Sequence, residues 1–443
     1  MTDLLAARSQ MGVSLAFHII FAVIGIAAPA MMVLAEWRHQ RTGDAVYLDL
    51  AKRWGRGTGI LFAVGAVSGT VLSFELGLLW PGFMKAAGPV IGMPFSLEGF
   101  AFFTEAIFLG VYLYGWDKVT PRAHLLAGVV VAVSGALSGV FVVIANAWMN
   151  APTGFTVMPD GSFANIDPLA AMANPAALSQ VVHMTVAAYA ATGLGVAGIH
   201  AALILRGRTA LFHRHALTVA LMIGVPAAIL QPLTGDLSAR FVAQHQPAKL
   251  AAMEGLFRTQ AGAPLAIGGW PDTDARELRY AIEVPRGLSL LAHHDPNATV
   301  EGLEEIPRED WPNVPAVHLS FQVMVALGTY MAAVAALVAW LVWRRRDVAA
   351  HRPALRLLAL GAPMGFLAIE AGWMVTELGR QPWVIYGVMR TAASVTPMPG
   401  QALRTSVFLL LYVFLSIVVT VLLTRQIVSS PVTGHTTEWK APS

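Results

Sequence analysis

Nine long apolar stretches dominate this 443-residue sequence, and each is long enough to cross a lipid bilayer as a helix. A spanning helix needs about 20 mostly apolar residues, because its backbone polar groups find no water in the hydrocarbon layer. Only 12% of the residues are charged, about half the share in an average soluble protein, so a water-soluble enzyme is excluded. We expect the spans at residues 11–35, 57–80, 95–115, 124–149, 179–205, 215–237, 316–343, 354–377 and 406–426.

Basic residues between the apolar stretches predict the orientation. Of the 29 Lys and Arg residues, 17 fall on one side of the expected bundle and 12 on the other, and seven of those 12 lie in one long loop. Long loops do not count in the positive-inside rule, so the bias places the N-terminus outside and the C-terminus in the cytoplasm. The predicted fold is an all-α integral membrane protein, a bundle of nine transmembrane helices with one long periplasmic loop.

Charge and cysteine content limit the chemistry. A net charge of +3 is too small to argue for a nucleic-acid partner. The sequence contains no cysteine, which excludes disulfides, iron–sulfur clusters and thiolate metal sites. Redox chemistry in this chain therefore needs His, Met, Glu or a cofactor that these residues hold.

Acidic residues occur inside the apolar stretches, where a charge costs about 2.5–3.5 kcal/mol on insertion scales and usually marks a functional site. They are Glu75, Glu98, Glu105, Glu370 and Glu377. Glu98 and Glu105 are seven residues apart, which places both on one face of a helix. Such a pair is typical of a proton relay or of ligand positions. One alternative is a proton- or ion-coupled membrane transporter that uses these carboxylates without a cofactor.

Three further side chains share one expected depth near the outer surface: His18, His183 and Met324. Imidazole and thioether together form the axial pair of a low-spin haem that carries electrons. A single Met in an apolar helix is usually core packing, so the pattern matters more than the residue. We interpret the histidines at expected helix ends as interfacial residues: His124, His200, His213, His215, His318 and His351.

Six motifs in order along the chain resemble subunit I of cytochrome bd-type quinol oxidases. EAGWMVTELGRQPW at 370–383 contains the GRQPW signature, and the other motifs are AFHIIF, EGFAFFTEAIF with YLYGWD, ANAWMNAP, VVHMTVAAYAATG and KLAAMEGLFRTQ. The resemblance covers the whole chain. It implies a quinol oxidase that takes electrons from ubiquinol or menaquinol on the outer side and reduces dioxygen to water with cytoplasmic protons.

The resemblance also implies the cofactor ligands. His183 and Met324 match the axial ligands of low-spin haem b. His18 and Glu377 match the ligands of the other two haems, a high-spin haem b and a haem d. Trp373 matches a tryptophan between haems.

Further matching positions surround these ligands. Glu98 matches the glutamate beside the haem pair, Arg8 matches an arginine near the haems, and Arg380 can pair with haem propionates. Lys249 and Glu254 match the pair implicated in quinol oxidation. Without the resemblance, that pair would be read as solvated loop charges.

The matched proton route consists of Glu105, Ser138 and Asn146. The implied partner is subunit II in a heterodimer, and a small accessory subunit is left open. The implied location is the bacterial cytoplasmic (inner) membrane. We divide the chain into haem-binding transmembrane helices 1–6 at 1–239, a periplasmic quinol-binding loop at 240–315, and helices 7–9 with the GRQPW motif and a cytoplasmic tail at 316–443.

Two departures from the family pattern stand out. Gln322 occupies a position where some members have Arg, which bears on the propionates of the low-spin haem. The loop lacks the extra stretch of long-loop members, so the chain resembles the short-loop group that includes cyanide-insensitive oxidases. Some of that group carry a third haem b in place of haem d.

Overall fold

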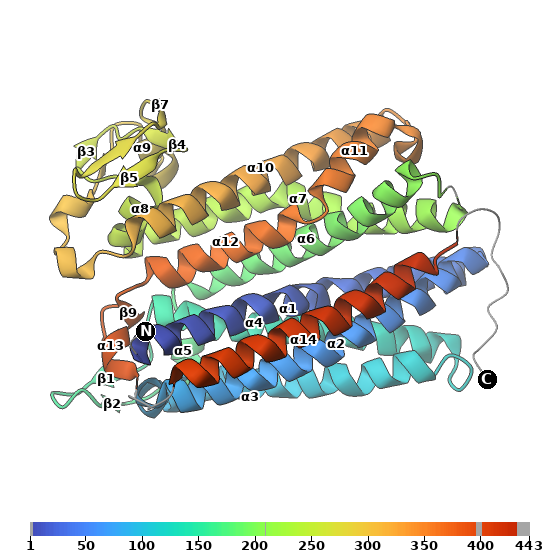
Figure 1. Ribbon diagram of the computed structural model, residues 1–443, viewed down its shortest axis with the longest axis horizontal. Helices are drawn as coiled ribbons and strands as arrows, with labels where there is room; N and C mark the ends of the chain where they lie inside the picture. The colour runs from blue at the N-terminus through green and yellow to red at the C-terminus, as the bar shows by residue number, and fades with distance from the viewer. Residues whose placement is uncertain (1–2, 209, 396–400, 432–443) are drawn as a thin grey trace.

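The computed structural model describes residues 3–208, 210–395 and 401–431, and these ranges are mostly helical (Figure 1). The tail that we predict to be cytoplasmic lies beyond residue 431 and thus outside them. Within the described ranges, nine helical segments are long and apolar enough to span a membrane, as the sequence predicts. They are α1 (Asp3–Thr42), α2 (Ala45–Leu79), α3 (Pro81–Tyr114), α4 (Pro121–Asn150), α6 (Ala177–Leu205), α7 (Leu211–His245), α10 (Val314–Trp343), the pair α11 (Arg352–Gly361) with α12 (Met364–Gly379), and α14 (Gln401–Val428).

The long helices form two groups of four, which appear as the lower and upper layers of Figure 1. In the first group α1 and α3 each contact both α2 and α4. In the second group α7 and α12 each contact both α6 and α10, so α6 and α10 lie at opposite corners. Helix α6 joins the groups by packing against α1 and α4, and α14 packs on α1 and α2.

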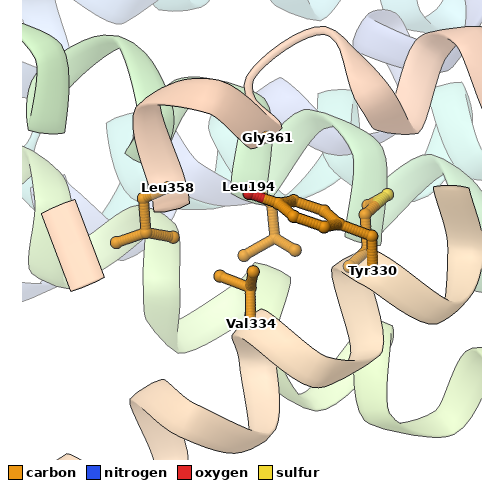
Figure 2. A pocket seen from close by; sticks show the side chains of 6 residues that line it. Leu194, Tyr330, Val334, Leu358 and Gly361 are labelled. Atoms are coloured by element: carbon orange, nitrogen blue, oxygen red, sulfur yellow. The ribbon is translucent and has the colours of Figure 1, made fainter. Parts of the chain in front are cut away.

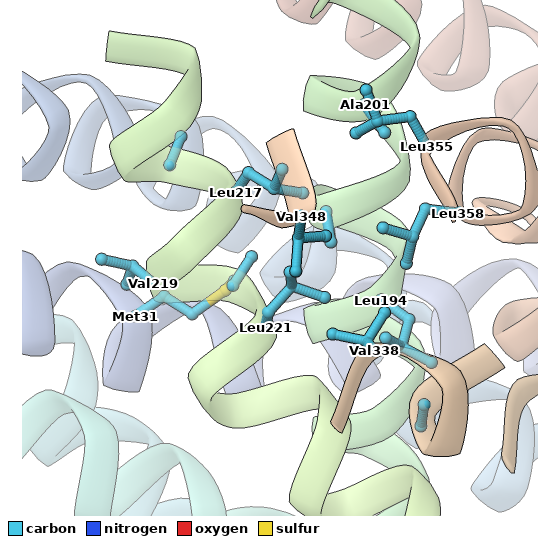
Figure 3. Close-up of a cluster of buried hydrophobic side chains, with 14 of the residues drawn as sticks. Met31, Leu194, Ala201, Leu217, Val219, Leu221, Val338, Val348, Leu355 and Leu358 are labelled. Carbon is cyan, nitrogen blue, oxygen red and sulfur yellow. The ribbon is translucent and has the colours of Figure 1, made fainter. Parts of the chain in front are cut away.

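Glycines allow the helices of the second group to approach closely. A Cβ atom on Gly193 of α6 would lie 2.5 Å from the Cα of Gly224 on α7, so neither position accepts a side chain without a shift. Small residues at such crossings are the usual way in which membrane helices pack. Leucine, valine and methionine side chains from α1, α6, α7, α10 and α11 fill the space around this crossing (Figure 3).

A small cavity in this group carries no functional signal. It has a volume of about 10 Å³, at the lower limit for a single water, and its lining is apolar apart from one phenol. Figure 2 shows Tyr330 crossing it toward Gly361. The hydroxyl of Tyr330 donates to the carbonyl oxygen of Leu357 at 2.9 Å.

The long loop between α7 and α10 is folded into short elements that lie at the same end of the molecule as the start of α1 (Figure 1). Helix α8 (Pro247–Glu254) ends at Gly255, whose φ of +64° suits glycine. Antiparallel pairs and short helices follow: β3 (Gln260–Ala261) with β8 (Thr299–Val300), β4 (Leu265–Ile267) with β7 (Ile282–Val284), β5 (Trp270–Asp272) with β6 (Glu277–Arg279), α9 (Gly287–His293), η1 (Leu303–Glu305) and η2 (Arg308–Asp310).

The loop begins later than the sequence predicts. Helix α7 continues to His245, because Arg240 pairs with Asp236 at 2.5 Å along the helix and His245 Nδ1 lies 3.0 Å from the Phe241 carbonyl oxygen. Shorter elements complete the same end of the molecule: β1 (Thr156–Val157), β2 (Phe163–Ala164), α5 (Pro168–Met172), β9 (Trp383–Ile385), β10 (Met389–Arg390) and α13 (Thr391–Ser394). The turn η3 (Val348–Ala350) joins α10 to α11.

Candidate functional site

A cavity of about 960 Å³ lies between α1, α2, α3, α4 and α12. This volume is at the upper end of the range of about 300–1,000 Å³ that small-molecule and cofactor sites occupy. Nine of the 13 predicted site residues line it: Arg8, His18, Glu98, Glu105, Ser138, Asn146, Trp373, Glu377 and Arg380. The cavity also borders Glu370, whose Oε1 has no hydrogen-bond partner among the described residues.

His18 on α1 is oriented by a hydroxyl on α2. Its Nδ1 lies 2.9 Å from Ser68 Oγ, which donates its own proton to the carbonyl oxygen of Val64 at 3.0 Å. Nδ1 is therefore the donor toward Ser68, and Nε2 remains available as an acceptor or metal ligand. The ring packs closely on Gly69, where a Cβ would lie 3.0 Å from His18 Cε1 and would crowd it.

Glu377 lies in the last turn of α12 and is held from two sides. Asn146 Nδ2 donates to its Oε1 at 2.5 Å, and the guanidinium of Arg380 donates to its Oε2. Arg380 is buried and also donates to the carbonyl oxygen of Val384. The structure thus commits this guanidinium to Glu377 and to the GRQPW turn.

The predicted carboxylates of α3 share one face, as their spacing predicts, because both line the cavity. Ser138 Oγ donates to Glu98 Oε1 at 3.4 Å. Glu105 is buried opposite Gly135, where a Cβ atom would lie 3.1 Å from Glu105 Oε1. Glu75, by contrast, is held by structural hydrogen bonds from other polar side chains and does not line the cavity.

His183 on α6 and Met324 on α10 lie on helices at opposite corners of the second group and outside the cavity lining. His183 Nδ1 lies 3.2 Å from Thr234 Oγ1, whose hydroxyl donates to the Gln231 carbonyl oxygen at 3.0 Å. The amide nitrogen of Gln231 also lies 3.1 Å from Nδ1 and 3.3 Å from Nε2, so polar side chains of α7 contact both ring nitrogens. A Cβ on Gly372 would lie 3.0 Å from the sulfur of Met324, so glycine leaves room beside the thioether.

Lys249 and Glu254 are buried, at 3% and 5% exposure, so their reading as solvated loop charges is wrong. Lys249 Nζ donates to Asn150 Oδ1 at 2.7 Å. Burial, reinforced by the positive charge of Arg380, lowers the pKa of Lys249 to about 7. Burial raises the pKa of Glu254 to about 8, and its Oε2 has no hydrogen-bond partner in the described part of the chain.

Two polar side chains on α10 hold the loop against the helix bundle. Gln322 Oε1 accepts from the Gly268 backbone N–H at 2.9 Å, and its Nε2 donates to the Ala266 carbonyl oxygen at 3.1 Å. The ring of His318 lies between the carbonyl oxygens of Met253 and Gly268, at 2.8 and 3.1 Å.

Several histidines that we interpreted as interfacial are in fact buried: His124, His200, His213 and His318. His124 Nδ1 lies 3.0 Å from Glu36 Oε1, and Nδ1 of His200 lies 3.0 Å from that of His213. Their positions at helix ends gave no signal of burial, because connecting segments and neighbouring helices cover them. Ser68, Thr234 and Asn150 were not predicted either, since hydroxyls and amides in membrane helices usually serve only to join helices.

The donor set fits iron porphyrins. Among the described residues, no three His, Cys, Asp or Glu side chains come together as a metal cluster. The imidazole of His18 and the carboxylate of Glu377 at the cavity suit iron whose other ligands come from a macrocycle. The imidazole of His183 and the thioether of Met324, on helices at opposite corners of the second group, suit such iron as well. The size of the cavity and the Arg8 side chain in its lining agree with such a ligand.

Comparison with known proteins identifies the family. The family model described as cytochrome bd terminal oxidase subunit I matches residues 6–431. The solved bd oxidase structure from Geobacillus thermodenitrificans matches with a TM-score of 0.91 and 41% identity, covering 97% of this chain and 99% of that chain.

Two proteins of Bacillus subtilis (strain 168) are also similar. The first, "Putative cytochrome bd menaquinol oxidase subunit I", is 38% identical over 402 residues, covering 89% of this chain and 90% of its own length. The second, "Cytochrome bd ubiquinol oxidase subunit 1", is 32% identical over 409 residues, covering 90% and 87%. Matches along the whole chain do not favour the transporter alternative. The chain belongs to the cytochrome bd terminal oxidase subunit I family.

Proposed function

We propose that this subunit of a terminal quinol oxidase oxidises membrane quinol at its outer loop and reduces dioxygen in the cavity between α1–α4 and α12. The observation that carries the proposal is the cavity of about 960 Å³ bordered by His18, Glu98 and Glu377. Buried Lys249 is connected to Glu377, which borders this cavity, through hydrogen-bonded asparagines, and Glu254 is buried at the end of the same helix α8. Relatives named for menaquinol and for ubiquinol are both similar, so we propose either quinol as donor.

We assign His183 and Met324 as the axial ligands of a low-spin haem b. We assign His18 and Glu377 to the other two haems, a high-spin haem b and a haem d, or a third haem b. Bound there, the haems supply one-electron transfer and the iron at which dioxygen is reduced. The position of Trp373 supports separate sites for the low-spin haem and the other two haems, because it lines the cavity and also packs with side chains of α1 and α6.

Lys249 and Glu254 bind and deprotonate the quinol. A lysine ammonium can donate a hydrogen bond to one quinol oxygen, while a carboxylate can accept the proton that leaves the other. Burial supports these roles, because a proton acceptor works best when its pKa lies near the working pH. The pKa of Glu254, at about 8, meets that condition.

Protons for oxygen reduction come from the cytoplasmic side through Glu105, Ser138 and Glu98. The hydrogen bond from Ser138 to Glu98 and the common face of the two glutamates support this route. Asn146 lines the same cavity and donates to Glu377, which supports its place at the Glu377 end of this route.

The subunit works with subunit II as its partner. We propose a periplasmic N-terminus and quinol-binding loop, with haem-binding helices before the loop and the GRQPW helices after it. The charge bias of the connections supports this arrangement. The arrangement makes the reaction electrogenic, because quinol releases protons outside while the oxygen site takes protons from inside.

Oxygen consumption by the purified oxidase tests this proposal. With ubiquinol or menaquinol analogues as donor, we expect activity that Glu254→Gln lowers about 10²-fold or more, since a positioned base contributes about that much. Glu301→Gln, at an exposed carboxylate of the same loop, is the matched control and should retain activity. An inactive wild-type complex, or equal loss in both variants, would contradict the proposal.

A further inference from the structure

A continuous line of hydrogen bonds connects the outer loop to Glu377. Lys249 Nζ donates to Asn150 Oδ1 at 2.7 Å, and Asn150 Nδ2 lies 3.3 Å from Asn146 Oδ1 and 3.0 Å from the Asn146 carbonyl oxygen. Asn146 Nδ2 then donates to Glu377 Oε1 at 2.5 Å. The two asparagines occupy positions i and i+4 in the last turns of α4, so one helix face presents both amides.

The chemistry at both ends fixes the orientation of the two amides. An ammonium can only donate, so the oxygen of Asn150 must face Lys249 and its nitrogen must face Asn146. A carboxylate can only accept, so the nitrogen of Asn146 must face Glu377 and its oxygen must face Asn150. All bonds therefore run in one direction, from the cation to the anion.

Asn150 is buried and is hydrogen-bonded on several sides. The side chain is 1% exposed, and its backbone carbonyl oxygen accepts from Gln246 Nε2 at 2.9 Å. The aliphatic part of Lys249 packs on Gly379, where a Cβ would lie 2.8 Å from Lys249 Cγ. The ammonium is thus held between the end of α4 and the end of α12, and buried hydrogen bonds to a charge are stronger than exposed ones.

We propose that Asn150 is a positioning residue for quinol oxidation. Its side-chain amide oxygen places the Lys249 ammonium where the quinol binds, and its side-chain N–H group couples that ammonium to the Glu377 carboxylate through Asn146. This inference rests on the proposed function of Lys249 and Glu377. It predicts two separable effects, one on quinol binding and one on the haem that Glu377 holds.

Two substitutions separate these effects in the purified two-subunit oxidase. Asn150→Leu keeps the approximate size but removes the side-chain hydrogen bonds to Lys249, Gln246 and Asn146. We expect it to raise the KM for quinol about 10- to 100-fold, more than it lowers kcat, and to shift the midpoint potential of the haem bound by Glu377. Asn150→Asp can still accept from Lys249 but has no N–H for Asn146, so we expect a nearly unchanged KM together with a shifted potential.

Asn174 supplies the control. It is another buried asparagine, whose side chain donates to backbone carbonyls near the same end of α4, and Asn174→Asp should change neither quantity. The low-spin haem spectrum reports folding in every variant. If Asn150→Leu folds and leaves both the KM and the potential unchanged, the inference is wrong while the proposed function stands. If wild-type oxidase shows no haem and no quinol oxidation, the proposed function fails first.

Discussion

At the scale of single residues, burial sets the protonation of the two loop residues that we assign to quinol oxidation. Lys249 has a pKa lowered to about 7 and Glu254 a pKa raised to about 8, and in both cases loss of water disfavours the charged form. Below pH 7 the lysine is charged and the acid neutral. Above pH 8 the acid is charged and the lysine neutral. The pair therefore changes state within the physiological range.

Quinol oxidation should respond to the ionisation of Glu254. The anionic form accepts the proton, and the ionised fraction falls about tenfold for each pH unit below the pKa. The proposed mechanism uses the Glu254 anion and the Lys249 ammonium together. We therefore expect kcat/KM for quinol to be highest between about pH 7 and 8 and to fall on both sides, and steady-state oxygen consumption measures it. Glu254→Gln should remove the fall on the acid side. A rate that keeps rising above pH 8 would contradict the requirement for the charged form of Lys249.

Candidate site residues could be found from the sequence only where a side chain is unusual for its surroundings. Glu98, Glu105 and His18 stand out because charged and titratable groups are rare in apolar stretches. Asn150 has no such signal, because its importance comes from Lys249, a residue 99 positions away that only the folded loop brings near. The burial of Lys249 and Glu254 was hidden for the same reason.

At the scale of helices and strands, hydropathy located every described span but underestimated its length. Hydropathy reports only the hydrocarbon layer, whereas a helix continues until a capping residue ends it. Helix α2 begins after Asp44, whose carboxylate accepts from the Val46 N–H at 2.8 Å, more than ten residues before the expected span at 57. The loop strands were not predicted, because segments of two or three residues carry no periodic pattern.

Close contacts between helices predict which glycines cannot be replaced by larger residues. Gly193→Val would force apart α6 and α7 at their crossing, where the Cβ has 2.5 Å to Gly224 Cα. We expect a stability loss of about 1–3 kcal/mol or more, seen as a lower unfolding temperature and lower yield of the haem-loaded complex. Gly328→Val on α10 is the control, because nothing lies within 4 Å of its Cβ position. Equal behaviour of the two variants would contradict this packing account.

At the scale of the whole molecule, the long loop and the start of α1 lie at one end and the end of α14 lies at the other (Figure 1). The sequence predicts this relation, since an odd number of spans separates the two termini. Which end faces the cytoplasm follows from the charge bias alone. The cavity between α1–α4 and α12 and the contact of the loop with α12 could be found only from the structure, because no local pattern encodes contacts between distant helices.

The orientation can be tested directly because the chain contains no cysteine. Asp274→Cys places a thiol at an exposed site of the long loop, which we assign to the outer side, and Lys118→Cys places one between α3 and α4 at the opposite end. In cells whose cytoplasmic membrane is intact and whose outer membrane, if any, lets the reagent pass, we expect a membrane-impermeant maleimide to label only the Asp274→Cys variant. Labelling of Lys118→Cys before cell disruption would reverse the assigned orientation.

The central claim is that iron porphyrins are held by individual side chains from separate transmembrane helices. Haem content together with reduced-minus-oxidised spectra tests this claim most directly. We predict three haems in the wild-type oxidase and two in His183→Ala, with loss of only the low-spin b-type bands and of electron flow from quinol to dioxygen. His351→Ala, at the N-terminus of α11, should keep all three haems. A His183→Ala complex with the full haem content and an unchanged low-spin spectrum would contradict the claim.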